Sequence, residues 1–200
     1  MVRIGISVEG QTEEIFVKKV LAPYLAQKNL FMTPICMQGD VNIDKVRSEL
    51  KKIANNFDYV TTFYDFYGFK NKVVGETKHS LEMRILNAVG ENIRGRLIPF
   101  VQMYEFEGIL FSCPKSFALI MRQANLKEWA DGLLQEFRGD PEKINNSPQT
   151  APSKRIMSVV RYRKTTHGPR IAEAIGVETI RNKCSGFNEW LHKIEKINDK

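Results

Sequence analysis

The chain has 200 residues, of which 42% are hydrophobic, 10% aromatic and 26% charged. This composition is typical of one folded soluble domain, and it excludes a disordered chain, a collagen or a coiled coil as the main class. No apolar run reaches the length of a membrane span. The first residues also lack the apolar core and cleavage site of a signal peptide, so we expect a cytoplasmic protein without membrane contacts.

The three cysteines, Cys36, Cys113 and Cys184, are scattered without any CxxC spacing. An odd number of cysteines at such positions argues against a disulfide framework or a zinc site. We therefore expect reduced side chains with a packing role.

The net charge of +7 is unevenly distributed. Residues 1–150 contain 19 basic and 18 acidic residues, whereas residues 151–200 contain 11 basic and 5 acidic ones. A basic segment is expected where a protein faces a polyanion such as nucleic acid, although a solvated surface that favours solubility has the same composition. Nucleic acid is therefore the first partner class that the sequence suggests.

Residues 1–103 alternate between strand-like and helix-like patterns. Short apolar runs predict strands, and apolar residues at helical spacing, such as Val46, Leu50 and Ile53, predict helices. The expected order is strand 2–8, helix 12–28, strand 31–37, helix 43–56, strand 58–64, loop 66–77, helix 79–92 and strand 97–103. Helices between strands imply crossover connections, so we predict an α/β fold with a mostly parallel central sheet of about four strands, flanked by helices.

The remainder of the chain is predicted to be mostly helical. The expected helices are 108–123, 126–137, 153–164, 169–175 and 179–197, with one long loop over 139–152 that is rich in Pro, Asn and Ser. We expect a single domain over residues 1–200, made of a sheet-rich core (1–112) and a basic, mostly helical C-terminal extension (113–200).

Acidic residues follow three of the predicted strands: Glu9 the first, Asp65 the third, and Glu105 with Glu107 the fourth. Ligands of open parallel sheets collect at the carboxyl ends of the strands. If the fourth strand continues to residue 107, Glu105 and Glu107 share one face. Carboxylates that converge at this edge repel one another unless a cation neutralises them, and oxygen ligands suit Mg²⁺ or Mn²⁺.

Each acid also has a structural interpretation. Glu9 and Glu13 would favour the positive end of the following helix, with Thr12 as its cap. Asp65 would be a turn residue, and Glu105 with Glu107 would form the acidic first turn of the next helix.

Five stretches of the sequence resemble a known family. They are residues 8–13 (VEGQTE), 64–69 (YDFYGF), 104–112 (YEFEGILFS), 141–145 with 150–155 (PEKIN, TAPSKR) and 164–169 (KTTHGP). They resemble the Toprim domain of topoisomerases, bacterial primases and overcoming-lysogenization-defect nucleases. The resemblance is closer to a subfamily of small stand-alone Toprim-related proteins of unknown function, often encoded beside an ATPase in bacterial defence loci.

The resemblance implies a Toprim-like fold in which Glu9 is the general acid or base and Asp65 a ligand of a divalent ion. The sequence departs from the family at Tyr67, because Toprim enzymes commonly have Asp-x-Asp where this chain has Asp65-Phe66-Tyr67. Glu105 or Glu107 would replace the missing carboxylate. If neither does, the fold binds nucleic acid or nucleotide without cutting it.

The basic residues near the C-terminus suggest a phosphate-binding surface. A helix from Ser153 would align Lys154, Arg161 and Lys164 on one stripe. Together with Arg155, this stripe would follow a phosphate backbone, and Lys154 would neutralise the reacting phosphate. His167 is a candidate for proton transfer because its pKa is suited to near-neutral pH. As structural alternatives, Ser153 would be an N-cap, the bases solvated charges, and His167 a turn residue.

Two function hypotheses follow. The leading one is a Mg²⁺- or Mn²⁺-dependent phosphodiesterase, most simply a nuclease of an anti-phage defence system. Its metal ligands would be Glu9, Asp65, Glu105 and Glu107, and its catalytic residues Glu9, Lys154 and His167. The alternative is a catalytically inactive module that binds nucleic acid or nucleotide and docks on an ATPase partner. A nucleotidyl-transfer enzyme is a third interpretation, and the lack of a GxxxxGK[ST] motif argues against an intrinsic ATPase.

Overall fold

The structure, a computed structural model, describes residues 1–145 and 147–199. Strands and helices alternate first, as β1 (Val2–Val8), α1 (Gln11–Phe16), the π-helical turn η1 (Val17–Leu21), α2 (Ala22–Ala26), β2 (Leu30–Cys36), α3 (Ile43–Ile53), β3 (Tyr59–Asp65), α4 (Lys78–Ala88), α5 (Glu91–Arg94), β4 (Leu97–Ile98) and β5 (Val101–Gln102). Helical elements follow, as η2 (Phe106–Ser112), α6 (Pro114–Met121), α7 (Asn125–Glu136), η3 (Pro141–Lys143), η4 (Pro148–Thr150), α8 (Pro152–Val159), α9 (Lys164–Ile175), α10 (Val177–Lys183), α11 (Ser185–Glu195) and η5 (Lys196–Asp199).

The strands form one sheet with the order β2-β1-β3-β4, and β5 also pairs with β3. All of the pairings are parallel. β1 is a central strand, and its residues from Ile4 to Val8 are buried, as expected when helices cover both faces of a parallel sheet. The predicted α/β fold with a mostly parallel, helix-flanked sheet is confirmed.

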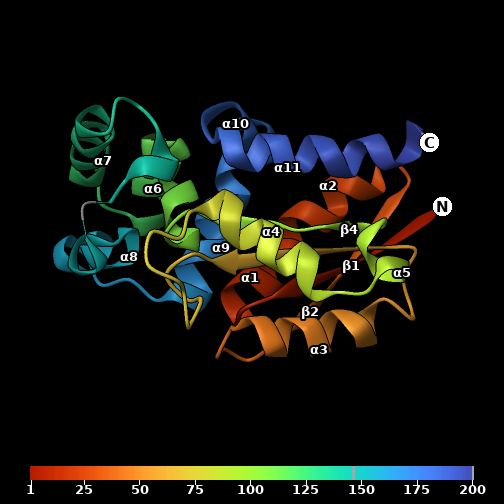
Figure 1. The fold of residues 1–200 in the computed structure, drawn as a ribbon. Helices are drawn as coiled ribbons and strands as arrows, with labels where there is room; N and C mark the ends of the chain where they lie inside the picture. The colour runs from red at the N-terminus through yellow and green to blue at the C-terminus, as the bar shows by residue number, and fades with distance from the viewer. Residues whose placement is uncertain (146, 200) are drawn as a thin grey trace.

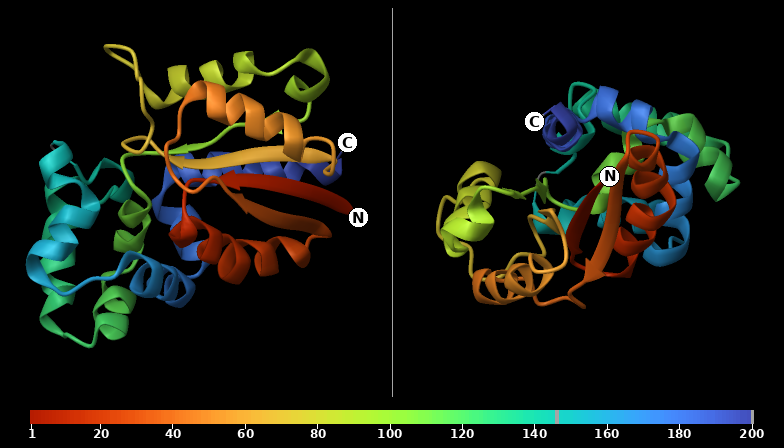
Figure 2. Two further views of the ribbon diagram at one scale, coloured as in Figure 1. Left: turned by 90° about the horizontal axis from the view of Figure 1, so that it is seen from below. Right: turned by 90° about the vertical axis from the view of Figure 1, so that its right-hand side faces the viewer.

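The two faces of the sheet have separate hydrophobic cores. Helices α3 and α4 pack together on one face, where Val46, Leu50 and Ile53 are buried as their spacing predicts. The helices α1, α2 and α9 to α11 cover the other face, and Figure 2 shows the two layers on opposite sides of the strands. Helix α11 is fixed to this face by Trp190, which stacks on Phe100 with ring centroids 4.7 Å apart.

Helices α6 to α8 lie beyond the carboxyl ends of the strands, at the left of Figure 1. The chain reaches them through η2, whose seven residues are all buried. The elements after β5 therefore surround the sheet edge at which the acidic residues were predicted.

Several boundaries differ from the sequence-based predictions. The strand predicted over 97–103 is two short strands, because Pro99 lacks the N–H that a continuous ladder needs. The hydroxyl of Thr62 fills the gap, since the Phe100 N–H donates to Thr62 Oγ1 at 2.9 Å and this hydroxyl donates to the Phe100 carbonyl at 2.8 Å. The loop predicted over 139–152 contains η3 and η4, and residue 146 lies outside the described residues.

The helix predicted over 153–164 is confirmed as far as Val159 and wrong beyond it. Helix α8 ends at Val159, and Val160 is extended with φ −151° and ψ 151°. Val160 and Tyr162 are buried, while Arg161 and Arg163 are exposed. This alternation is the period of a half-buried extended segment, and it outweighs the helical spacing. The next helix, α9, begins at Lys164, five residues before the predicted start of 169.

In the described part of the chain, no helix combines the length and the hydropathy needed to cross a bilayer.

Candidate active site at the carboxyl edge of the sheet

Glu9 directly follows the central strand β1, and its carboxylate lies beside the end of β3. The backbone N–H of Asp65 donates to Glu9 Oε2 at 3.4 Å. The carboxylate also packs against Gly68, where an added β-carbon would lie 2.6 Å from Glu9 Cδ and nearer still to both oxygens. The side chain of Glu9 thus occupies the space that a glycine leaves open after β3.

Asp65 is the last residue of β3, and only 9% of it is exposed. Its Oδ1 is buried and has no hydrogen-bond partner among the described residues. Burial raises the pKa of Asp65 well above its ordinary value, and the negative charges of Glu13, Glu9 and Glu107 raise it further. A buried acceptor without a partner is costly and points to a missing proton or cation.

Glu13 is a third buried acid in this region. It caps the start of α1, where Gly10, and not the predicted Thr12, is the N-cap residue, and the Gly10 N–H donates to Glu13 Oε2 at 2.9 Å. Burial and the charge of Glu9 both raise the pKa of Glu13. The structural interpretation as a helix-start residue is therefore correct, yet the same side chain adds to the negative charge around Asp65.

Glu105 and Glu107 approach from η2 and not from a strand. The left-handed backbone of Tyr104, with φ 63°, ends the extended segment before them, so the prediction that they share a strand face is wrong. Glu107 lies in the first turn of η2, as the structural interpretation expects, whereas Glu105 is the residue before this element. The Ser153 N–H donates to Glu105 Oε2 at 2.9 Å, and Glu107 accepts a hydrogen bond from the Tyr162 hydroxyl at 3.3 Å. Burial raises the pKa of Glu107 to about 7.

Lys164 is the cation of the site. Its Nζ lies 3.4 Å from Glu107 Oε2 and 3.8 Å from Glu105 Oε1. Burial opposes its charge, but the charges of Glu107, Glu105 and Asp65 outweigh burial and raise the pKa of Lys164. The sequence had placed Lys164 on a phosphate-binding stripe, whereas the structure places it among the predicted metal ligands.

A pocket of ≈ 660 Å³ opens at this point, lined by the charged side chains Glu9, Glu13, Glu14, Asp65 and Lys164 together with residues 10–12, Cys36, Gln38 and Gly39. We call it the acid pocket. Burial raises the pKa of Glu9, and the nearby Glu105 and Glu107 raise it further, while the Asp65 N–H and Lys164 oppose the shift. The pocket therefore has more negative charge than Lys164 balances.

The donor set of the acid pocket fits a hard divalent cation. Carboxylate oxygens are the ligands that Mg²⁺ and Mn²⁺ favour, and the unpartnered Oδ1 of Asp65 is an available one. In the described part of the chain, however, no three Asp, Glu, His or Cys side chains are already arranged to hold a metal ion. The residue types are those that bind a divalent cation, but their side chains would have to change conformation to coordinate one.

The other predicted basic residues do not line the acid pocket. Lys154 is exposed on α8, and Arg161 is exposed in the extended segment before α9. The predicted stripe of Lys154, Arg161 and Lys164 on one helix is wrong, because α8 and α9 are separate helices. Arg155 donates to the Thr150 carbonyl at 2.8 Å and lies over the Phe137 ring.

His167 lies in the first turn of α9, where its Nδ1 accepts a hydrogen bond from the Arg163 N–H at 3.0 Å. Burial and the positive charges of Arg163 and Arg170 lower the pKa of His167. The contact is structural, and a role in proton transfer stays a prediction.

Two positions of the candidate site were missed by sequence reasoning. Gly68 was interpreted only as part of a loop, although a glycine three residues after a strand-end acid is a signal of close backbone approach. Glu13 was interpreted only as a helix-start residue. Glu13 is buried because α1 packs against α9, and this contact between distant segments cannot be inferred from the residues around Glu13.

The comparisons with known proteins agree with this fold. Residues 8–195 match the family described as "Domain of unknown function (DUF4276)". Among solved structures, the C-terminal region of the Burkholderia pseudomallei OLD protein matches with a TM-score of 0.55 and 12% sequence identity, over 98% of each chain. No curated protein gives a significant match. The predicted Toprim-like fold class is confirmed by the structural match.

Proposed function

Because the chain belongs to the DUF4276 family and has the Toprim-like fold of the OLD C-terminal region, we propose that it is a divalent-metal-dependent phosphodiesterase that cleaves nucleic acid. The observation that carries this proposal is the unpartnered carboxylate oxygen of Asp65, buried next to Glu9, Glu13 and Glu107. Groups with such perturbed pKa values cluster at functional sites, and here Asp65, Glu9 and Glu13 line one pocket.

The acid pocket supplies the roles that the reaction needs. Asp65, Glu9 and Glu107 would hold the ion, with Glu105 as a further ligand. A bound divalent ion supplies positive charge to the phosphate as negative charge develops in the transition state. Glu9 is suited to proton transfer at its carboxylate because burial raises its pKa toward the working pH.

The substrate is proposed to approach from the side of α8 and α9. Lys164 lies at the acid pocket, and Lys154, Arg161 and Arg163 are exposed nearby in sequence. Exposed lysines and arginines bind phosphates with little sequence preference. Lys154 and His167 remain candidates for catalysis on the strength of the family resemblance, as do an ATPase partner and a role in anti-phage defence.

A second function is favoured by the position of Lys164. Its ammonium already lies within ion-pair distance of Glu105 and Glu107, and Tyr67 stands where an Asp-x-Asp motif would have its second carboxylate. The alternative proposal is therefore a catalytically inactive module that binds nucleic acid or nucleotide through its basic residues and docks on an ATPase.

Titration calorimetry with Mn²⁺ and Mg²⁺ separates the two proposals. The variants are Asp65→Asn and Glu9→Gln, which keep side-chain size, with Glu128→Gln on the exposed surface of α7 as the matched control. Under the nuclease proposal, wild type and control bind Mn²⁺, and the two site variants bind it at least tenfold more weakly. The same two variants should also lose Mn²⁺-dependent cleavage of labelled DNA or RNA. Absence of ion binding by a folded wild-type chain would refute it and leave the inactive module.

A further inference from the structure

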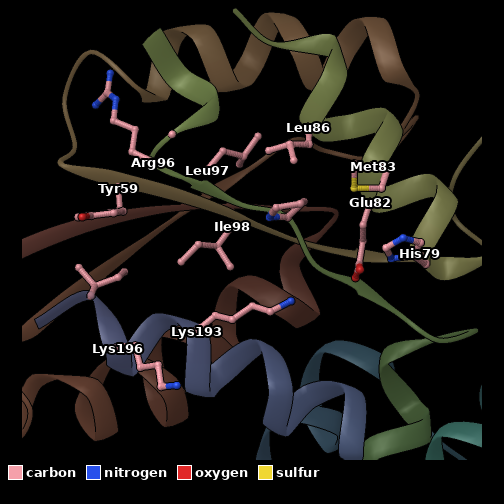
Figure 3. Close-up of a pocket in the computed structure, with 13 residues that line it drawn as sticks. Tyr59, His79, Glu82, Met83, Leu86, Arg96, Leu97, Ile98, Lys193 and Lys196 are labelled. Atoms are coloured by element: carbon pink, nitrogen blue, oxygen red, sulfur yellow. The ribbon is translucent and has the colours of Figure 1, made fainter. Parts of the chain in front are cut away.

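A second pocket, of ≈ 450 Å³, opens at the outer edge of the sheet, between α4 and α11 (Figure 3). We call it the edge pocket. It borders β4, the last strand in the order β2-β1-β3-β4. The two pockets share no lining residue. Tyr59 of the edge pocket and Asp65 of the acid pocket are the first and last residues of β3, so about 20 Å of extended strand separates them.

The interior of the edge pocket is apolar. It is formed by Met83 and Leu86 of α4, by Leu97, Ile98 and Pro99 at the sheet edge, and by Ile197. Met83 is 39% exposed, so part of this apolar surface is open to solvent. Pockets that hold small ligands span roughly 300–1,000 Å³ and combine an apolar interior with a few polar groups.

The rim of the edge pocket is positively charged. Lys193 and Lys196 project from the end of α11 and from η5, and Figure 3 shows both beside the apolar interior. Neither lysine is within ion-pair distance of a carboxylate of the described residues. Arg96, by contrast, donates to the Phe57 carbonyl at 2.6 Å, and its side chain is directed away from the pocket.

Glu82, the one carboxylate among the described residues that line the edge pocket, is already engaged. Glu82 accepts a hydrogen bond from the Val101 N–H at 3.0 Å and lies 3.8 Å from Lys78 Nζ. Its closest partners are therefore Lys78, at the start of α4, and the backbone of β5, while the charge of Lys193 acts on it more weakly. The two lysines of the rim remain available to an external anion.

We propose that the edge pocket binds a small amphipathic anion, with its apolar body in the recess and its carboxylate or phosphate group against Lys193 and Lys196. Addition of a partner strand is a poorer match, because β4 has only two residues and Pro99 has no N–H to donate. The proposal is independent of the proposed nuclease activity, since it uses none of the residues of the acid pocket.

The test uses the fluorescent anion 8-anilinonaphthalene-1-sulfonate and its uncharged analogue N-phenyl-1-naphthylamine as probes of the full chain. The variant Lys193→Gln with Lys196→Gln is compared with Lys115→Gln with Lys183→Gln, which removes the same charge from exposed lysines of α6 and α10. Met83→Glu adds a negative charge to the apolar wall. Near-ultraviolet circular dichroism confirms that each variant is folded.

We expect the rim variant to bind the anionic probe at least tenfold more weakly, with the uncharged probe unaffected and the control like wild type. Met83→Glu is expected to weaken the binding of both probes. Displacement of the bound anion by decanoate or by decyl phosphate then identifies the preferred head group. The proposal is overturned if folded wild type binds no probe, if the rim variant binds the anion like the control, or if neither decyl compound displaces it.

Discussion

The substitution Gly68→Ala tests the geometry of the acid pocket with a single added methyl group. The new β-carbon would lie 2.6 Å from Glu9 Cδ, whereas ordinary contact begins at 3.4 Å, so the carboxyl group must move by about 1 Å. The group that moves is the end of a flexible side chain, and the backbone of Gly68 is not in the left-handed region. The substitution therefore displaces Glu9 without breaking the fold.

The expected magnitudes differ between stability and function. A Gly-to-Ala change in compatible backbone stabilises by roughly 0.4–1 kcal/mol through the unfolded state, which offsets the strain of moving Glu9, so we expect a net change within about 1 kcal/mol. A misplacement of 1 Å costs up to about 10²-fold in rate. We accordingly expect near-normal unfolding in urea, weaker Mn²⁺ binding and a comparable loss of any cleavage activity.

The matched control is Gly132→Ala in α7, where an added β-carbon meets no atom within 4 Å. It should raise stability by about 0.5–1 kcal/mol and leave ion binding unchanged. A direct readout is the ¹³C signal of the Glu9 carboxyl group, identified by its disappearance in Glu9→Gln. If Gly68→Ala leaves this signal and Mn²⁺ affinity as in wild type, or if it unfolds the protein, the inferred contact between Gly68 and Glu9 is wrong.

Three further predictions concern the scaffold. Glu142→Gln should lower the free energy of unfolding by about 1–3 kcal/mol in urea, because Glu142 accepts two backbone N–H groups at the start of α11; Glu189→Gln, on the exposed surface of that helix, should change little. Trp190→Phe removes the indole N–H that donates to Thr61 at 2.8 Å, and it should cost a similar amount by the same assay. Burial raises the pKa of Glu195, but its hydrogen bonds with Arg181 and Tyr24 and the nearby positive charges together outweigh burial and lower it, so its contribution to stability is present above pH about 4.3 and lost as the pH falls further. Urea midpoints at pH 6 and pH 3 should therefore differ less in Glu195→Gln than in wild type, and equal differences would contradict this.

The positions of Glu9 and Asp65 could be predicted from the sequence because both directly follow buried strands. The carboxyl ends of parallel strands lie at one edge of the sheet, so a correct prediction of these two strands is enough to place the two acids near each other. The fold class follows from the same alternation of strands and helices. Neither prediction needs knowledge of the loops.

The path of the chain after β5 could not be predicted in the same way. Tyr104 adopts a left-handed backbone that tyrosine rarely favours, so no local signal marks the turn that brings Glu105 and Glu107 to the site. The break between α8 and α9 did leave a signal, the alternation of apolar and basic residues from Val160 to Arg163. It was outweighed by the apparent helical spacing of Lys154, Arg161 and Lys164.

The position of Lys164 also limits how this protein can be divided. Asp65 and Glu107 lie on β3 and η2, within the first 112 residues, but the ammonium that offsets their charge is supplied from α9. A fragment that ends after η2 would lose that cation together with the helices α9 to α11 that cover one face of the sheet, so its carboxylates would have neither their counter-charge nor their buried surroundings. Two separately expressed halves should therefore form the acid pocket only when they are mixed. A chimera of the N-terminal half with the C-terminal half of another protein requires a lysine or arginine at the position of Lys164.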